Sequence, residues 1–262
     1  IHTLIRIVKR TILILPVLAS LAGCGGGSGP LGLSAEPIRI LSPGDSWTYT
    51  VSGNATKLFP DGSGVSGNFN GTMVRKILTT TLSDHVGATC QVLDETWDIL
   101  IPTGRELLNF QQCFSQDSDG RIFLHGNSDP IRGLAVNPVS RFVVDPAVGS
   151  FLILNSPVGV GDAVELGPAT FDDAATTDGS YTIPIREKVP LAIKTFDAFR
   201  METNTRQVSG GTAFTIQVTR WMVPQLGTEV KEEGMILKEV ASPQHTDTLV
   251  FTAVLTASTV SF

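Results

Sequence analysis

The stretch GDSWTYTVSGN, residues 44–54, decides the fold class. Trp47, Tyr49 and Val51 alternate with serine and threonine, and this period of two predicts a β-strand with one buried and one solvated face. The same period recurs in TAFTIQVTRWM, residues 212–222, and in TLVFTAVLTASTV, residues 248–260. Strands of this kind are typical of antiparallel sheets.

Glycine-containing turn signals separate these apolar runs, and no capped amphipathic helix stands out after residue 37. We therefore expect an all-β, antiparallel domain over residues 38–262, built as a strongly curved sheet, an open half-barrel or a sandwich. It forms one domain or two similar halves with a break near residues 155–160. The expected turns are Pro60-Asp61-Gly62, Pro102-Thr103-Gly104, Asp119-Gly120, Asp178-Gly179 and Gly210-Gly211.

The first 23 residues have the pattern of an export signal. Arg6, Lys9 and Arg10 precede the apolar run TILILPVLASLA, and no acidic residue occurs among them. As a signal helix the run spans about 18 Å, less than the hydrocarbon core of about 30 Å that a transmembrane helix must cross. Residues 24–37, rich in glycine and proline, follow as a tether to the folded domain.

Leu21-Ala22-Gly23-Cys24 resembles the lipobox of bacterial lipoproteins. The resemblance implies that Cys24 is lipidated, with palmitate among the acyl chains, and becomes the mature N-terminus. It also implies the outer membrane in preference to the inner, since inner-membrane lipoproteins usually carry Asp where this chain has Gly25. An ordinary secretory signal and a cytosolic protein with an apolar N-terminal helix are the alternatives.

The charge of such a mature chain excludes some partners. Loss of the three basic residues leaves 16 basic and 25 acidic side chains, a formal charge of −9. A negative protein lacks the basic surface that nucleic acids require. It also lacks a polybasic patch for anionic lipid, so the acyl chains on Cys24 must provide the membrane attachment.

A second, scattered resemblance covers residues 43–240. The segments PGDSWTYTVSG, FSQDSDGRIFLHG, PVGVGDAVEL, KVPLAIKTFDAFRMET and RWMVPQLGTEVKEEG resemble a group of uncharacterised, β-rich envelope lipoproteins with repeated G-D-x-W strands. Val164 replaces the second tryptophan of that pattern, and Lys194 replaces a glycine. The resemblance implies an antiparallel sheet with internal duplication, curved like the half-barrels of lipoprotein carriers, and it carries no catalytic residues.

Cys90 and Cys113 are candidates for a disulfide in an oxidising compartment. The bond would close a loop of 23 residues and stabilise the fold by about 3 kcal/mol. A hairpin turning at Pro102-Thr103-Gly104 places Cys113 opposite Leu93, about three residues out of register, so the bond needs a bulge or a different turn. Two buried free thiols are the alternative.

Four motifs suggest chemistry but have simpler explanations. Residues 62–67 match G-x-G-x-x-G without the strand and helix of a dinucleotide site, and we interpret them as a hairpin loop. Asp117, Asp119 and Gly120 resemble half of an EF-hand, but Gly126 stands where the bidentate glutamate belongs, so we expect a turn. The acidic pairs Asp94-Glu95, Asp172-Asp173 and Glu232-Glu233 are expected to be solvated. His85, His125 and His245 are widely spaced and predict no metal site.

Trp47, Trp97 and Trp221 are expected in the core, with a ligand groove as the alternative. We predict no catalytic residue and no cofactor. The sequence thus favours a lipid-anchored, non-enzymatic binding or structural module of the cell envelope, whose partners are the membrane and an envelope protein. A carrier of an apolar ligand or lipid is the second hypothesis, and an envelope hydrolase is the third.

Overall fold

The computed structural model describes residues 35–83, 89–101, 104–127, 140–143, 151–171, 176–209 and 211–261. These residues contain strands and turns but no helix, as expected for an all-β chain. The strands are β1 (Ser46–Leu58), β2 (Gly64–Ser83), β3 (Thr89–Ile101), β4 (Gly104–Gln116), β5 (Ile122–Asn127), β6 (Ser140–Val143), β7 (Phe151–Leu154), β8 (Ala163–Phe171), β9 (Thr176–Pro190), β10 (Thr195–Ser209), β11 (Thr212–Val223), β12 (Thr228–Ala241) and β13 (Gln244–Ser258).

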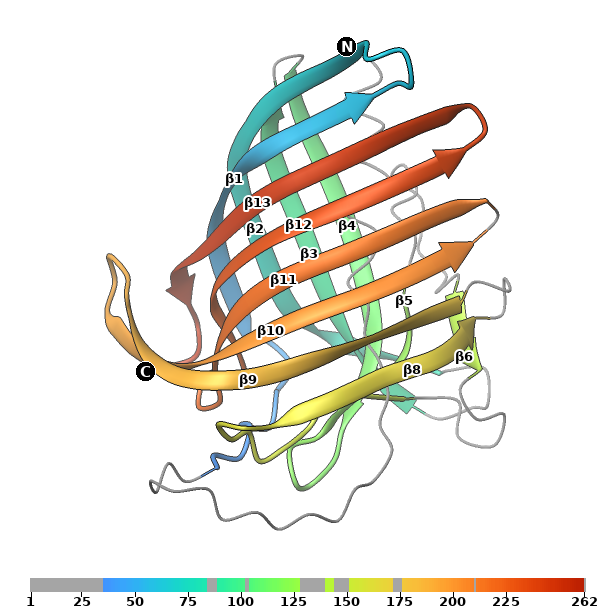
Figure 1. The fold of residues 1–262 in the computed structure, drawn as a ribbon. Helices are drawn as coiled ribbons and strands as arrows, with labels where there is room; N and C mark the ends of the chain where they lie inside the picture. Colours follow the sequence, from blue (N-terminus) through green and yellow to red (C-terminus); the bar gives the residue numbers. More distant parts are fainter. Residues whose placement is uncertain are drawn as a thin grey trace.

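The strands form one antiparallel sheet in the order β4-β3-β2-β1-β13-β12-β11-β10-β9-β8-β6-β5-β7, with an additional pairing of β4 with β5. Figure 1 shows β8 to β13 in one layer and β3 and β4 behind them, so the sheet is strongly curved. In the described part of the chain, β6 pairs with β5 and with β8 through two residue pairs each. The sheet therefore curls on itself without closing into a barrel of regular strands.

Two arms of the sheet, joined through β1, face each other across the core. We call β2–β4 the first arm and β9–β13 the second arm. Trp97 on β3 meets Phe251 on β13 edge to face, with ring centroids 6.2 Å apart. One apolar cluster contains inward residues of both arms, among them Met73, Ile99 and Ile216. The curved-sheet prediction is confirmed.

The alternation that predicted the strands also predicted their buried faces. Trp47, Tyr49 and Val51 are buried on β1, as is the set Leu249, Phe251, Ala253 and Leu255 on β13. β1 pairs with β13 from Trp47–Ser258 to Leu58–Thr246. Strands from both sides of residues 155–160 thus lie side by side in the same sheet, while the internal duplication stays a prediction.

Two turn predictions were wrong. Asp178-Gly179 lies inside β9, where Gly179 pairs with Thr205 and with Leu166. The hairpin loop expected over residues 62–67 is shorter, since β2 begins at Gly64. In both places glycine stands within a ladder, because a side chain there would meet backbone: an added Cβ would lie 2.4 Å from the Asn204 carbonyl at Gly179 and 2.4 Å from the Lys57 carbonyl at Gly64.

The disulfide is present, and its register differs from the expected one. Ile101 pairs with Gly104, so Cys113 lies opposite Val92 and not opposite Leu93. Cys90 and Val92 share a face of β3 because side chains two residues apart on a strand point the same way. Cys90 and Cys113 are therefore diagonal neighbours, with Cα atoms 5.5 Å apart, within the range for a disulfide.

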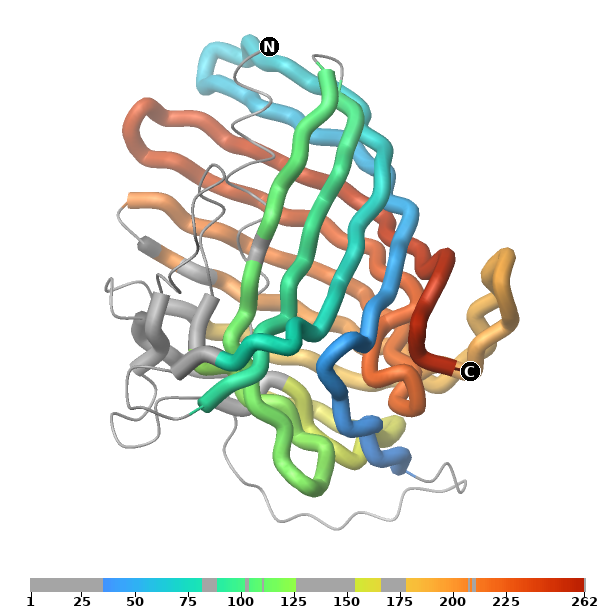
Figure 2. Tube along the Cα trace, turned by 180° about the vertical axis from the view of Figure 1, so that it is seen from behind, coloured from blue at the N-terminus to red at the C-terminus, as the bar shows by residue number. Residues whose placement is uncertain are grey.

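Residues 35–45, which we call the strap, cross one end of the curled sheet (Figure 2). Glu36 and Val158 exchange two backbone hydrogen bonds of 2.8 Å, and the Arg39 amide donates to the Pro224 carbonyl. The Leu41 amide donates to Oε1 of Gln116. Within the described residues, backbone bonding to the rest of the fold therefore begins at Glu36, inside the predicted tether of residues 24–37. We call this the strapped end, and the opposite end, with the turns after β1, β10 and β12, the hairpin end.

Candidate functional site

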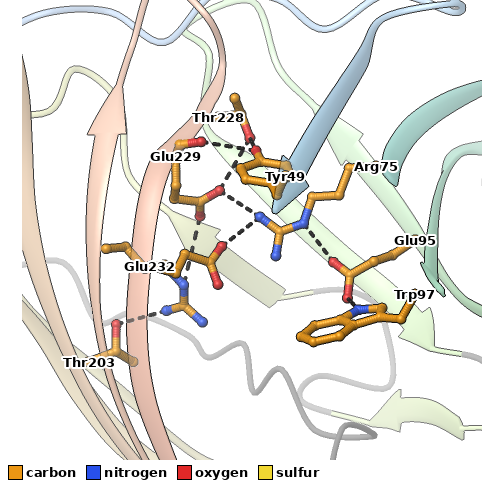
Figure 3. Close-up of polar contacts among 9 residues, drawn as sticks. Tyr49, Arg75, Glu95, Trp97, Thr203, Thr228, Glu229 and Glu232 are labelled. Atoms are coloured by element: carbon orange, nitrogen blue, oxygen red, sulfur yellow. Dashed lines mark hydrogen bonds and ion pairs between the residues drawn. The ribbon is translucent and has the colours of Figure 1, made fainter. Parts of the chain in front are cut away.

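A β-bulge in β12 brings two glutamates to the interior of the curled sheet. Met222 pairs with Glu229 and Trp221 with Lys231, so Val230 is the extra residue. In a regular strand, residues three apart point to opposite faces. The extra residue shifts this phase, and the carboxylates of Glu229 and Glu232 both reach the same guanidinium group (Figure 3).

That guanidinium belongs to Arg75 on β2 and links the two arms. Its Nε donates to Oε2 of Glu95 on the neighbouring β3 at 2.6 Å. Its Nη1 donates across the interior to Oε1 of Glu232 at 2.6 Å and to Oε2 of Glu229 at 3.0 Å. The Arg75 side chain is 7 % exposed and that of Glu232 is 2 %. One buried cation thus holds carboxylates from both arms.

Neutral donors and a second arginine complete the cluster. The Trp97 indole donates to Oε1 of Glu95 at 2.6 Å, and the Tyr49 hydroxyl donates to the Glu229 carbonyl at 2.9 Å and bonds the Thr228 hydroxyl at 2.8 Å. Arg220 lies with its Nε 3.8 Å from Oε1 of Glu229 and donates through Nη1 to the Thr203 hydroxyl. We call this set the interior ion cluster: Tyr49, Arg75, Glu95, Trp97, Thr203, Arg220, Thr228, Glu229 and Glu232.

The electrostatic surroundings in the cluster keep Arg75 and Glu232 in their charged forms. Burial alone raises the pKa of Glu232, but the charges of Arg75 and Arg220 and the hydrogen bond from Arg75 bring this pKa below its ordinary value. Burial lowers the pKa of Arg75, and the nearby glutamates raise it well above the ordinary value. Burial also raises the pKa of the Tyr49 phenol. At neutral pH Glu232 is therefore ionised and Tyr49 is neutral. These protonation states suit permanent ion pairs between the two arms better than proton transfer.

The interior ion cluster is nearly balanced in charge. Three glutamates face two arginines, a formal charge of −1. Each carboxylate lies within 4 Å of, or is hydrogen-bonded to, a guanidinium, as buried charges require. Among the described residues, those of the cluster included, no group of three or more His, Cys, Asp or Glu side chains could hold a metal ion.

Sequence reasoning missed this cluster, and one of its interpretations needs correction. The pairs Asp94-Glu95 and Glu232-Glu233 were expected to be solvated, yet Glu95 and Glu232 are buried. Neighbouring residues of a strand point to opposite faces, and Asp94 accordingly accepts hydrogen bonds from Asn109 and Gln111, away from Arg75. Asp172-Asp173 lies outside the described residues.

The three tryptophans come from β1, β3 and β11. Trp47 and Trp97 are 2 % and 4 % exposed in the interior core. Trp221 is 8 % exposed, and its indole donates to Glu187 on β9 at 2.7 Å, while Nζ of Lys231 lies 4.4 Å from its ring centroid. All three tryptophans are buried members of the apolar core cluster, as expected, and the ligand groove stays a prediction.

The remaining candidates are dispersed. His125 contacts the Ser115 hydroxyl at 2.9 Å, and Nδ1 of His245 lies 2.7 Å from the Pro243 carbonyl, while His85 lies outside the described residues. Asp119-Gly120 forms the expected turn between β4 and β5. Cys24 and the signal segment lie outside the described residues. Within those residues, no helix is long and apolar enough to cross a membrane.

Comparison with known proteins adds little to this geometry. No family model matches the chain, and no curated protein matches it. Among solved structures, a Bacteroides fragilis NCTC 9343 protein that is thought to be exported and has a YmcC-like fold is similar, with 11 % sequence identity and a TM-score of 0.36. The match covers 85 % of this chain and 99 % of that one. A likeness at this level carries no argument about function.

Proposed function

We propose that the protein is a lipid-anchored, non-enzymatic module of the cell envelope, which binds or supports other envelope components from the outer membrane. The observation that carries the proposal is how the lipobox connects to the fold. Eleven residues after Cys24, the chain enters the strap, which is bonded to β4, to the β7–β8 connection and to the β11–β12 turn. A pull on acyl chains at Cys24 is thereby distributed over several strands.

The interior supports a structural role over a catalytic one. Its most charged region is the interior ion cluster, in which Arg75 holds carboxylates from both arms. A general acid needs a proton to give near neutral pH, and the lowered pKa of Glu232 leaves that carboxylate without one. Fixed, mutually paired charges between two arms act as a clamp that sets the curvature of the sheet.

The second hypothesis, a carrier of an apolar ligand or lipid, has one observation in its favour. The concave side of the sheet is lined by apolar side chains of both arms, such as Met73, Ile99 and Phe251. Opening of the arms would expose this surface to an acyl chain. Native mass spectrometry of protein extracted from its own membrane distinguishes the two hypotheses, because a carrier retains a non-covalently bound lipid in addition to the acyl chains on Cys24, and a structural module carries the acyl chains alone.

Metabolic labelling with a palmitate analogue tests the anchor. We expect the wild type to be labelled and to sediment with membranes, and the Cys24→Ala variant to carry no label. Equal labelling of both chains, or labelling of neither, would refute the anchor. A Cys90→Ala, Cys113→Ala double variant is the matched control, because it removes the other two cysteines and should keep the label.

A further inference from the structure

The first and the last of the described strands lie side by side inside the sheet. β1 has β2 on one side and β13 on the other (Figure 1). Its pairing with β13 runs from Trp47–Ser258 to Leu58–Thr246, along nearly the whole of β1. One complete edge of β1 therefore has no partner until β13 is available.

The first arm depends on the second arm to cover its apolar face. Together with β1 it is a four-stranded sheet, whose inward side chains Tyr49, Met73, Trp97 and Ile99 are at most 4 % exposed. Part of their cover comes from β13, where Phe251 meets Trp97 edge to face. A sheet with one uncovered apolar face lacks the second layer that stable folds need. β1 and the first arm therefore gain little stability before the second arm is in place.

The interior ion cluster imposes the same dependence through its charges. Without the second arm, Arg75 keeps Glu95 but loses Glu229 and Glu232, which lie 154 and 157 residues further along the chain. Without the first arm, Glu232 loses the guanidinium that holds it. Because an unpaired buried charge is costly, each arm contains charged groups that need the other arm.

Contacts between parts of the chain so far apart in sequence form slowly, because closure of a long loop costs chain entropy before the contact stabilises anything. We propose that β1 and both arms fold in a single step that requires β13, so that an exported chain stays unfolded until its last strand has crossed the membrane. The inference rests on the proposed place in the cell envelope and goes beyond it, since it assigns a role to the order of the strands.

The order of the strands gives an exported chain a built-in delay. A chain that is threaded through a secretion channel has to remain extended during its passage. A first arm that folded by itself would obstruct the movement of the residues that follow. A first arm whose partner strand comes last in the chain does not fold early enough to do so.

Pulsed hydrogen exchange during refolding tests the single step. The full chain, with its disulfide intact, is diluted from urea, and mass spectrometry follows the protection of backbone amides in peptides from β2–β3 and from β12–β13. We expect both sets of peptides to become protected with the same rate constant. Earlier protection of either arm overturns the proposal.

A variant in β13 makes the test sharper. Leu249 is fully buried and pairs with Ala55 of β1, so Leu249→Ala should slow the protection of both arms alike, by about tenfold. Val250→Ala is the matched control, because Val250 is the next residue and is 49 % exposed; it should refold close to the wild-type rate. Leu249→Val, which removes only one methylene group, replaces the alanine variant if that chain does not refold. Slowing that is confined to the second arm overturns the proposal.

The folding test and the anchor test fail independently. Refolding is measured on the purified chain, and the Cys24→Ala variant should refold with the wild-type rate constants. A wild type without acyl label refutes the anchor and leaves the single folding step standing. Unequal rate constants in the two arms refute the single step and leave the anchor standing.

Discussion

Replacement of Arg75 by methionine removes the cation that joins the two arms. Methionine keeps most of the apolar stem, so the main change is the loss of charge beside Glu95, Glu229 and Glu232. Removal of one partner of a buried ion pair leaves an uncompensated buried charge and destabilises a protein by about 3–5 kcal/mol. We expect a loss of this size in the free energy of unfolding at pH 8.

The pH dependence of this loss distinguishes the clamp from simple packing. In the wild type the pKa of Glu232 lies below its unfolded value, so its stabilisation is present above the unfolded pKa and is lost only as pH falls through the folded pKa. Without Arg75, burial dominates and raises the pKa of Glu232. The folded variant then takes up protons more readily than the unfolded chain, and its stability rises as pH falls from 8 to 5.

Urea unfolding followed by tryptophan fluorescence, at pH 8 and pH 5, measures both effects. Arg105→Met is the matched control, because Arg105 pairs with Asp98 across β3 and β4 with 76 % of its side chain exposed, and solvent screens such a pair. This control should change stability little at either pH. A loss below about 1 kcal/mol for Arg75→Met, or a loss that grows on acidification, would refute the reasoning.

Three further outcomes follow from the described contacts. Gly120→Ala should destabilise the fold more than Gly62→Ala: both glycines have positive φ, for which an L residue loses about 1–2 kcal/mol, but only at Gly120 would a Cβ meet the strap, 2.5 Å from the Ile38 carbonyl. Thermal unfolding of the two variants compares them, and equal losses would contradict the strap contact. Reduction of the Cys90–Cys113 disulfide should lower the free energy of unfolding by about 3 kcal/mol, and mass spectrometry after alkylation without reductant should find neither thiol modified. Tyr49→Phe, which removes the hydrogen bonds to Thr228 and to the Glu229 carbonyl, should lose about 1–2 kcal/mol; an unchanged midpoint in urea would show that the hydroxyl is not needed.

The alternation of apolar residues predicted much of the sheet, because one buried face imposes a period of two. Trp47, Tyr49 and Val51 are buried as their spacing indicated. Turn positions were less certain, because glycine serves both turns and close backbone approach. Gly179 illustrates the second use, since it lies within β9 at a position where an added Cβ would meet Thr205.

Local sequence patterns could not predict the interior ion cluster. Its glutamates come from β3 and β12, and a bulge at Val230 decides that two of them face inward. The sequence nevertheless contains one indication of the cluster. Arg75 lies on the same face of its strand as buried Met73 and Ile77, and Glu95 lies on the same face as buried Trp97 and Ile99. A charged residue on the apolar face of a strand predicts a buried ion pair, although only the folded sheet shows which residue is its partner.

The anchor at Cys24 is the central claim, and intact-mass spectrometry of protein extracted from membranes tests it most directly. The account predicts a chain that begins at residue 24 and carries the added mass of acyl chains, all of which maps to an N-terminal peptide ending before the strap. A chain that retains residues 1–23, or one that begins at residue 24 without acyl mass, would contradict it.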